Sequence, residues 1–303
     1  MTGIPFISIV VPTCHRNDLL AKCLECLAPG QQAVDAGDYE VIVTDDGRRE
    51  TAREMVAQRF PWARWVAGPK DGPAANRNNG AREARGEWIA FTDDDCLPQA
   101  TWLGEIARIA RENRAEVIEG RTLTPDKVDS PFRQGVENTG GGVFWSCNLA
   151  VKRAVFLDLG GFDEDFKEAS DEDMEFGWRL RQRGCSWCFA AEALVLHPVR
   201  VVTWAGIWKK TKMRRWGELL QIKTGQAPAL ETSAPRVAAC VAGRWILNMF
   251  RGTWHLVKHR HLPMRRTRLF WLLWEWMMFP FLLPYTLRWH FRFRETLRAR
   301  ARA

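Results

Sequence analysis

The segment Trp88-Ile89-Ala90-Phe91-Thr92-Asp93-Asp94-Asp95-Cys96 places three consecutive carboxylates directly after a short apolar run. The apolar run predicts a buried strand that ends at the acids. Side chains alternate along an extended chain, so Asp93 and Asp95 are expected on one side and Asp94 on the other. Two carboxylates on one side are hard oxygen ligands that suit Mg²⁺ or Mn²⁺ carrying a phosphate. The alternative is a solvated turn before a helix that starts near Gln99.

Charge is distributed unevenly along the 303 residues. Residues 1–197 carry 23 Lys and Arg against 32 Asp and Glu, a net charge of −9. Residues 198–303 carry 21 against 4, a net charge of +17, and the two parts sum to the +8 of the whole chain. An acidic body and a strongly basic tail, which also holds 9 of the 16 tryptophans, indicate two different tasks in one chain.

The eight cysteines follow no secretory pattern. Residues 1–5 show no charged region followed by an apolar run, so we expect no signal peptide and a reducing compartment with free thiols. Two pairs, Cys23 with Cys26 and Cys185 with Cys188, have the C-x-x-C spacing of some zinc sites. They lie in apolar helical and strand patterns, which favours buried small hydrophobic residues over zinc ligands.

Apolar runs and helical patterns alternate through the first hundred residues. Expected strands cover residues 6–12, 39–44, 63–66 and 88–92, and expected helices cover residues 19–27, 50–60 and 76–84. This alternation predicts an α/β fold with right-handed crossovers and a mostly parallel sheet, whose length and 46% hydrophobic content suffice for a substantial core.

Three polar clusters follow three of the expected strands. They are Thr13 to Arg16, Asp45-Asp46, and Asp93 to Asp95. Ligands of parallel α/β sheets bind beyond the carboxyl ends of the strands, so the three clusters are expected to line one site. Turn formation explains each cluster separately, but explains less readily why all three fall on the same edge.

Five motifs, in this order, resemble the family-2 glycosyltransferases of GT-A fold. They are IVVPT at 9–13, VTDDG at 43–47, ANRNNGA at 75–81, ARGEWIAFTDDD at 84–95 and GGFDE at 160–164. The resemblance covers roughly residues 5 to 198. It implies a nucleotide-sugar donor, most often a UDP-sugar, a divalent cation (Mg²⁺ or Mn²⁺) at the aspartates, and a transfer that inverts the sugar configuration.

The resemblance also assigns residues to the nucleotide. Pro12 and Thr13 match the first loop, which borders the nucleotide, and either Asp45 or Asp46 matches the acid that holds the base or the ribose. The alternative for Asp46 is a turn former, and that for Arg77 is an exposed arginine at a helix start. The residues placed at the nucleotide by the resemblance are Pro12, Thr13, Arg16, Asp45, Asp46, Arg77 and Asp94. This chain has Arg48 where many members have serine, a departure from the family pattern on the ribose side.

The second half of the resemblance supplies a base and a further metal ligand. Glu172-Asp173 looks like the acidic pair that opens a helix near the acceptor, and inversion at a sugar carbon needs such a carboxylate to take the proton of the incoming hydroxyl. Asp173 is the first choice and Glu172 the second. The alternative is a helix start in which Ser170 is the N-cap and the acids complement the helix dipole. His197 is the candidate to complete the metal shell with Asp93 and Asp95.

The segment between these halves is less regular. Residues 121–140 are polar and show no clear period, as expected for a lid or an acceptor loop. The glycines that follow at 140–142 suit either a close approach to a sugar or a hinge. Strand character is expected to return over residues 140–150, which include these glycines.

The tail combines tryptophan with basic residues. Residues 204–220 predict a basic amphipathic surface helix. Residues 269–287 form the most apolar window and are just long enough to span a bilayer, but Glu275, Pro280 and Pro284 favour a kinked, interfacial or re-entrant segment. A helical pack without membrane contact is the alternative, and the interleaved apolar runs argue against nucleic-acid binding.

The sequence as a whole predicts two domains. Residues 1–200 form a nucleotide-sugar-binding catalytic domain, and residues 201–303 form a basic helical region on the cytoplasmic face of the cell membrane, held by anionic lipid. The predicted activity is sugar transfer to a glycan or lipid-linked acceptor. One alternative is a nucleotidyltransferase, which requires a glycine-rich phosphate loop after the first strand, where this chain has Pro12-Thr13-Cys14-His15. The other is a catalytically inactive nucleotide-binding adaptor.

Overall fold

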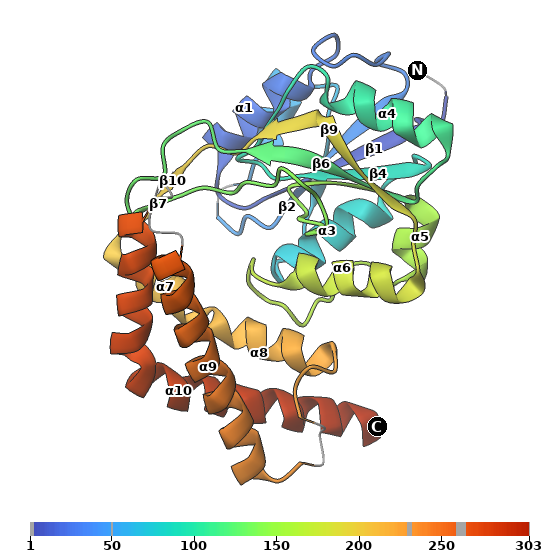
Figure 1. The fold of residues 1–303 in the computed structure, drawn as a ribbon. Coiled ribbons are helices and arrows are strands. Elements are labelled where there is room, and N and C mark those ends of the chain that lie inside the picture. Colours follow the sequence, from blue (N-terminus) through green and yellow to red (C-terminus); the bar gives the residue numbers. More distant parts are fainter. Residues whose placement is uncertain (1–2, 50, 229–231, 259–264, 303) are drawn as a thin grey trace. The chain divides into compact units, whose positions relative to one another are not determined.

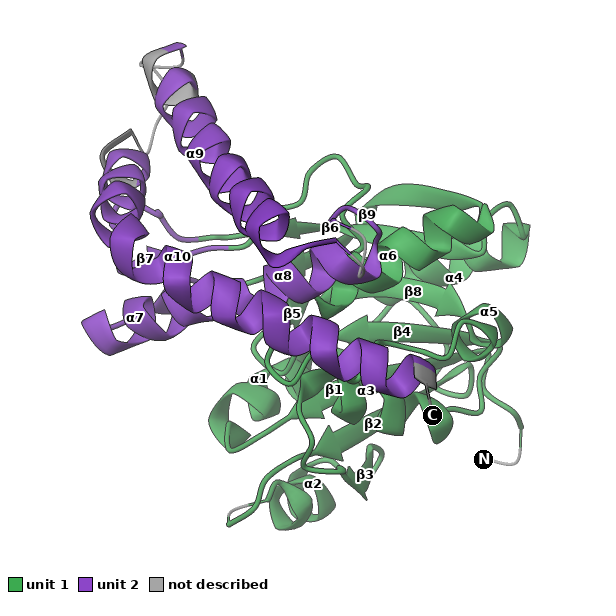
Figure 2. Cartoon of the chain, turned by 90° about the horizontal axis from the view of Figure 1, so that it is seen from below, with its two compact units in different colours: residues 1–125, 136–198 green, residues 126–135, 199–303 purple. Residues whose placement is uncertain are grey.

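The structure is a computed structural model that describes residues 3–49, 51–228, 232–258 and 265–302. The chain divides into two compact units, coloured separately in Figure 2. The N-terminal unit comprises Met1–Pro125 and Val136–Pro198, and the C-terminal unit comprises Asp126–Gly135 and Val199–Ala303.

An eight-stranded sheet forms the centre of the N-terminal unit, with helices on its faces (Figure 1). Its strands, in sheet order, are β3 (Arg64–Ala67), β2 (Tyr39–Asp45), β1 (Ile7–Thr13), β4 (Trp88–Thr92), β8 (Asn148–Lys152), β6 (Val117–Leu123), β9 (Trp187–Leu196) and β5 (Leu97–Pro98). The first four strands are parallel, as are β6 and β9, whereas β8 and β5 run antiparallel to their neighbours.

Helices connect and cover these strands. They are α1 (Asn17–Leu27), α2 (Arg53–Arg59), α3 (Pro73–Arg82), α4 (Trp102–Glu112), α5 (Arg153–Asp158) and α6 (Glu172–Arg183). The predicted fold class, a mostly parallel α/β sheet of GT-A type followed by a helical C-terminal region, is confirmed.

The continuous apolar strands are buried on both faces. All seven residues of β1 are buried, and they alternate between two core clusters. Ile9 packs with Val41 on one face of the sheet, and Val10 packs with Ile42 on the other. Burial of both faces explains why β1 and the Val41–Val43 centre of β2 show consecutive apolar residues rather than alternating ones. Cys23 and Cys185 belong to these clusters, and all eight cysteines are free thiols.

Some predicted boundaries are wrong. The helix expected near Gln99 begins at Trp102, because Leu97–Pro98 pairs with β9 instead. The N-cap of α6 is Asp171 rather than Ser170, and its side chain makes no capping hydrogen bond. Strand character after the glycines returns only at Asn148.

The C-terminal unit is mainly helical. It contains a short ribbon of β7 (Arg133–Gln134) and β10 (Arg200–Val201), followed by α7 (Trp204–Lys212), α8 (Arg214–Lys223), α9 (Ala234–Lys258) and α10 (Arg265–Arg302). The single helix expected over residues 204–220 is therefore two helices that meet at Met213.

The apolar window at 269–287 lies inside α10, which contains both Pro280 and Pro284. Figure 1 shows that α10 changes direction along its length. Proline inside a helix removes a backbone hydrogen bond, and this kinks the helix. Among the described residues, no helix combines the length and the apolar character that crossing a bilayer requires.

Buried polar contacts tie three helices of this unit together. Glu218 of α8 accepts a hydrogen bond from Arg244 of α9 and lies 3.0 Å from Nδ1 of His290 on α10. The side chain of His290 is fully buried and that of Glu218 nearly so. Because a buried carboxylate needs such partners, these contacts fix how the three helices pack.

Candidate active site

The loops after β1, β2 and β4 meet at one edge of the sheet. Pro12 and Thr13 end β1 in register with Thr44 and Asp45 of β2, and all four are buried. The Thr13 hydroxyl donates a 2.7 Å hydrogen bond to Oδ2 of Asp94. The three polar clusters expected at the carboxyl ends of the strands are thus brought together.

Asp94 stabilises this edge of the sheet through buried contacts with the loop after β1. Its carboxylate is fully buried and pairs with Arg16, whose Nε lies 3.0 Å from Oδ2. Burial raises the pKa of Asp94 to about 7, although Arg16 and the Thr13 hydrogen bond act in the opposite direction. Arg16 also reaches Oδ2 of Asp95 at 3.2 Å. The prediction that Asp94 points away from Asp95 is therefore wrong.

The reason is that the extended chain ends before the acids. β4 stops at Thr92, and the amide of Cys96 bonds to the carbonyl of Asp93 at 3.1 Å, which closes a turn. Alternation of side chains holds only in extended backbone, so it does not apply to Asp93 to Asp95. The turn instead directs two successive carboxylates toward Arg16.

Arg77 joins the acidic turn to the start of α6. Its guanidinium lies 2.6 Å from Oδ1 of Asp93 and 2.9 Å from Oε1 of Glu172. Burial lowers the pKa of Arg77, but the two carboxylates outweigh this and raise it overall. Only 4% of Arg77 is exposed, so the alternative of an exposed arginine at a helix start is wrong.

Two asparagines on either side of Arg77 hold α3 in place. Asn76 accepts a 2.7 Å hydrogen bond from the Thr44 hydroxyl and donates to the Thr44 carbonyl at 3.0 Å. Asn78 pairs with both backbone groups of Phe162 at 2.8 Å. A Cβ on Gly161, which has φ +73°, would lie 2.4 Å from Asn78 Oδ1. These contacts account for the ANRNNGA and GGFDE motifs.

The two acids that open α6 have different surroundings. Both oxygens of Glu172 are engaged, one by Arg77 and the other by the amide of Ser170 at 2.8 Å. Asp173 accepts the amide of Met174 at 2.8 Å, and burial together with the charge of Glu172 raises its pKa well above the ordinary value. Both oxygens of Glu172 are therefore paired within the protein, whereas the Asp173 carboxylate is held by a backbone amide.

Asp45 and Asp46 also differ. Asp45 accepts hydrogen bonds from the amides of Gly47 and Ala52 at 2.7 and 2.6 Å, and from the Trp65 indole at 3.1 Å. These bonds occupy both of its oxygens and shape the loop after β2. Asp46 accepts the amide of Lys70 at 2.9 Å, and burial raises its pKa.

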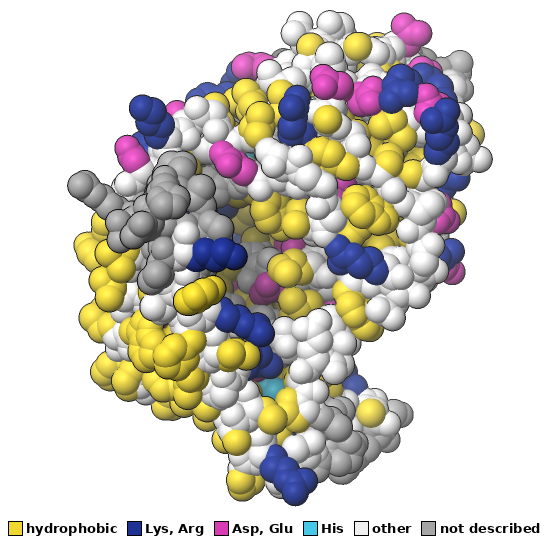
Figure 3. Space-filling model, viewed as in Figure 1, with side chains coloured by type: hydrophobic (Ala, Val, Ile, Leu, Met, Phe, Trp, Pro, Cys, Tyr) yellow, Lys and Arg dark blue, Asp and Glu magenta, His cyan; other side chains and the backbone are white. Residues whose placement is uncertain are grey.

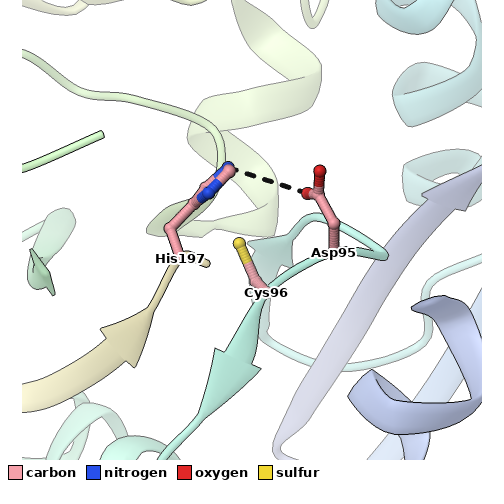
Figure 4. Close-up of side chains that lie close together, drawn as sticks. All are labelled: Asp95, Cys96 and His197. Carbon is pink, nitrogen blue, oxygen red and sulfur yellow. Dashed lines mark ion pairs between the residues drawn. The ribbon is translucent and has the colours of Figure 1, made fainter. Parts of the chain in front are cut away.

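Three ligand types converge beside the acidic turn. Asp95, Cys96 and His197 each offer a ligand atom within 4.8 Å of the others, and Figure 4 shows their side chains pointing toward one another. Nε2 of His197 is 3.7 Å from Oδ1 of Asp95. Asp93, expected to be the second carboxylate ligand, does not belong to this group and pairs with Arg77 instead.

The donor atoms fit a divalent cation. Nδ1 of His197 lies 3.1 Å from the Pro198 carbonyl, which can only accept, so Nδ1 carries a proton and Nε2 is the nitrogen that faces Asp95. A hydrogen bond to Cys147 and burial raise the pKa of the Cys96 thiol, which keeps it protonated. A carboxylate oxygen and an imidazole nitrogen suit Mn²⁺, and the oxygen suits Mg²⁺.

Sequence reasoning missed Glu119 of β6. This buried carboxylate accepts hydrogen bonds from the amides of Gly142, Val143 and Phe144, and from Nδ2 of Asn138. The glycines permit the positive φ values by which the loop curls around the carboxylate. A lone acid within the otherwise strand-like residues 117–123 was the available signal.

Comparison with known proteins adds to this geometry. The sequence model described as "Glycosyl transferase family 2" matches residues 8–159, about half of the chain. The chain belongs to glycosyltransferase family 2. The matched region contains β1 to β4, α3 with Arg77 and the whole acidic turn.

Several family members resemble the chain at modest identity. Validoxylamine A glucosyltransferase of Streptomyces hygroscopicus subsp. limoneus is 28% identical over 232 residues, covering 63% of this chain and 51% of that protein. The GalNAc(5)-diNAcBac-PP-undecaprenol beta-1,3-glucosyltransferase of Campylobacter jejuni is 31% identical over 179 residues, covering 57% and 55%. The chain thus spans about half the length of these relatives.

A solved structure shares the fold. The mannosyltransferase PcManGT from Pyrobaculum calidifontis, in complex with GDP-Man and Mn²⁺, aligns with a TM-score of 0.57 at 17% identity. The alignment covers 95% of this chain and 74% of that one. At this identity the likeness shows a common fold.

Proposed function

We propose that this protein transfers a sugar from a nucleoside-diphosphate sugar to an acceptor hydroxyl, with inversion at the anomeric carbon. The observation that carries this proposal is the Arg77 bridge. It holds Asp93 of the acidic turn and Glu172, the neighbour of Asp173, on one guanidinium. The bridge supports a diphosphate site and a base that belong to one active site, and membership in the family supports sugar transfer over nucleotidyl transfer.

The donor lies, in this proposal, along the carboxyl edge of the first four strands. Pro12 and Thr13 border the nucleotide. Asp46 binds the nucleobase, because both carboxylate oxygens of Asp45 already accept hydrogen bonds from within the protein. Arg16 has a side chain 38% exposed and offers a positive charge to the diphosphate. Asp94 keeps Arg16 and the first loop in place, and a UDP-sugar is the expected donor.

Asp95 and His197 are proposed to hold Mg²⁺ or Mn²⁺. When bound there, the cation offsets negative charge on the diphosphate leaving group. The protein orients these two ligand side chains before the cation binds. The Pro198 carbonyl fixes the tautomer of His197, and Arg16 keeps Asp95 oriented. Asp93 supports this turn through Arg77.

Asp173 is proposed as the general base. The acceptor oxygen forms a bond to the anomeric carbon while the bond from that carbon to the diphosphate oxygen breaks, and Asp173 takes the hydroxyl proton. A single displacement of this kind inverts the configuration and needs no covalent intermediate. The raised pKa of Asp173 suits this task, because a more basic carboxylate accepts a proton more readily.

The acceptor and the location follow from the relatives and from charge. One relative is named for a substrate linked through diphosphate to undecaprenol, which supports a glycan or lipid-linked acceptor here. The net charge of +17 over residues 198–303 supports attachment to anionic lipid on the cytoplasmic face of the membrane. In this proposal residues 1–200 are catalytic and residues 201–303 attach the enzyme.

A donor panel tests the proposal. Purified protein is mixed with UDP-, GDP- and dTDP-sugars in Mn²⁺, in Mg²⁺ and in a chelator, and nucleotide release is followed. We expect release from one donor class, dependent on the cation. Without an acceptor the sugar passes to water, and proton NMR recorded before the released sugar mutarotates should then show the opposite anomeric configuration. A retained configuration would contradict the single displacement, and nucleotide binding without turnover of any donor would favour the inactive adaptor.

A further inference from the structure

The C-terminal unit exposes apolar side chains on two helices. Among the described residues, 17 large hydrophobic side chains are exposed, and more than half of them lie on α9 and α10. Figure 3 shows hydrophobic side chains gathered over this part of the molecule. The nine residues, called here the α9–α10 face, are Ile246, Leu247, Phe250, Trp254, Leu269, Leu273, Trp276, Met277 and Phe281.

The α9–α10 face is continuous. On α9, Ile246, Phe250 and Trp254 recur every four residues, and the spacing of 269, 273, 277 and 281 on α10 is the same, so each helix carries one apolar stripe. The rings of Phe250 and Trp276 are 5.8 Å apart, which joins the two stripes. Exposed apolar side chains in one connected group mark an interaction surface more often than scattered ones do.

The unit does not need this face for its own core. The opposite side of α9 buries Val237, Val241, Trp245 and Met249. The Trp245 ring lies 5.8 Å from that of Phe279 on α10, so the two helices already pack through other side chains. The exposed stripes are therefore available to a partner.

Charge indicates what that partner is. Leu247, Arg251, Trp254 and Lys258 follow one another along the same side of α9 at helical spacing, and Arg251 and Lys258 are exposed. On α10, Arg288 and Arg292 lie seven and eleven residues beyond Phe281, and both are exposed. Tryptophan with flanking arginine and lysine is typical of helices that lie in the headgroup zone of a bilayer.

We propose that the α9–α10 face inserts into the surface of an anionic lipid bilayer, with these cations at the headgroups. The inference rests on the proposed membrane location and identifies the residues that enter the lipid. A second copy of the chain fits the face poorly, because residues 198–303 carry 21 Lys and Arg against 4 Asp and Glu and two such surfaces repel. The face lies on the bilayer and does not cross it, in keeping with the hydropathy of the described helices.

Vesicle flotation with the full chain tests this. Two side chains of the face, Trp254 and Phe281, are each 69% exposed, and replacing both with serine removes apolar area at little cost to packing. We expect the W254S/F281S variant to bind phosphatidylglycerol-containing vesicles about a hundredfold more weakly. The matched control is Ile4→Ser, which changes a side chain 84% exposed in the N-terminal unit and should bind as the unaltered protein does.

The other arms separate charge, self-association and activity. R288Q/R292Q should weaken binding to phosphatidylglycerol vesicles, whereas vesicles of phosphatidylcholine alone should bind the unaltered protein weakly. Donor hydrolysis in solution should be the same in W254S/F281S and in the unaltered protein. If the unaltered protein hydrolyses no donor, the proposed function is wrong, whereas the vesicle measurements still test the α9–α10 face. Equal vesicle binding by W254S/F281S, or a dimer of the unaltered protein that this variant converts to a monomer, would overturn the proposal.

Discussion

The Asp173→Asn variant is expected to lose sugar transfer by a factor of about 10² to 10⁴ in kcat, the range that removal of a general base produces. Asparagine keeps the size of the side chain and can still accept the Met174 amide, but it cannot take the acceptor proton. Donor binding should stay within about threefold of the unaltered enzyme, because Asp173 acts on the acceptor side. Initial rates and calorimetric titration of nucleotide give the two values.

A neighbouring aspartate supplies the control for this variant. Asp171 is the N-cap of α6, and asparagine serves that position as well as aspartate does. Asp171→Asn removes one negative charge two residues away and should keep its transfer rate. If both variants lose activity equally, local charge rather than proton transfer explains the effect. Normal turnover in Asp173→Asn would show that another group is the base.

The pH dependence gives a second readout of the same residue. A base works when ionised, and burial with the charge of Glu172 raises the pKa of Asp173. Transfer should therefore be full above that raised pKa and fall as the pH drops through it, at higher pH than an ordinary aspartate would give. In Asp173→Asn the remaining activity should lack this acidic limb.

The second large effect is expected on stability. Replacing Arg77 with methionine leaves Asp93 and Glu172 without the guanidinium that they share. Breaking a buried ion pair from one side costs about 3 to 5 kcal/mol, because the carboxylates stay largely buried after losing the positive charge beside them. Urea unfolding of Arg77→Met should show this loss in the free energy of unfolding, together with loss of transfer.

Arg82 on the same helix is the matched control. Its side chain is 57% exposed and pairs with Glu164 at the surface, so Arg82→Met should cost at most about 1 kcal/mol. Adding Glu172→Gln to Arg77→Met removes one of the stranded charges and should recover part of the stability. Equal costs for Arg77→Met and Arg82→Met would contradict the role given to the buried bridge.

The sequence was sufficient for the sheet and for the edge at which the site lies. Apolar runs without alternation predict strands buried on both faces, and β1 and β4 follow that rule. The polar clusters after these strands meet because parallel strands bring their carboxyl ends together. The apolar runs and helical patterns therefore predicted a mostly parallel α/β sheet, and the five motifs supplied the resemblance to the GT-A fold.

The roles within the site were harder to predict. Arg77 contacts Glu172 across 95 positions of sequence, and no local pattern distinguishes a buried bridge from a pocket arginine. The turn after Thr92 ended the alternation on which the positions of the three aspartates were based. Glu119 was overlooked because its partners are backbone amides, which leave no mark in a sequence. In the tail, neither glycine nor proline stands at Met213, where α7 ends and α8 begins, so the sequence pattern did not predict two helices.

The central claim is that Asp95 and His197 hold a cation for the diphosphate while Asp173 serves the acceptor. Calorimetric titration of nucleoside diphosphate, with Mn²⁺ and with a chelator, tests it in the unaltered protein, in Asp95→Asn and in Asp173→Asn. We predict that Mn²⁺ tightens binding by about tenfold or more in the unaltered protein and in Asp173→Asn, and has no such effect in Asp95→Asn. Full Mn²⁺ dependence in Asp95→Asn, or its loss in Asp173→Asn, would contradict the claim.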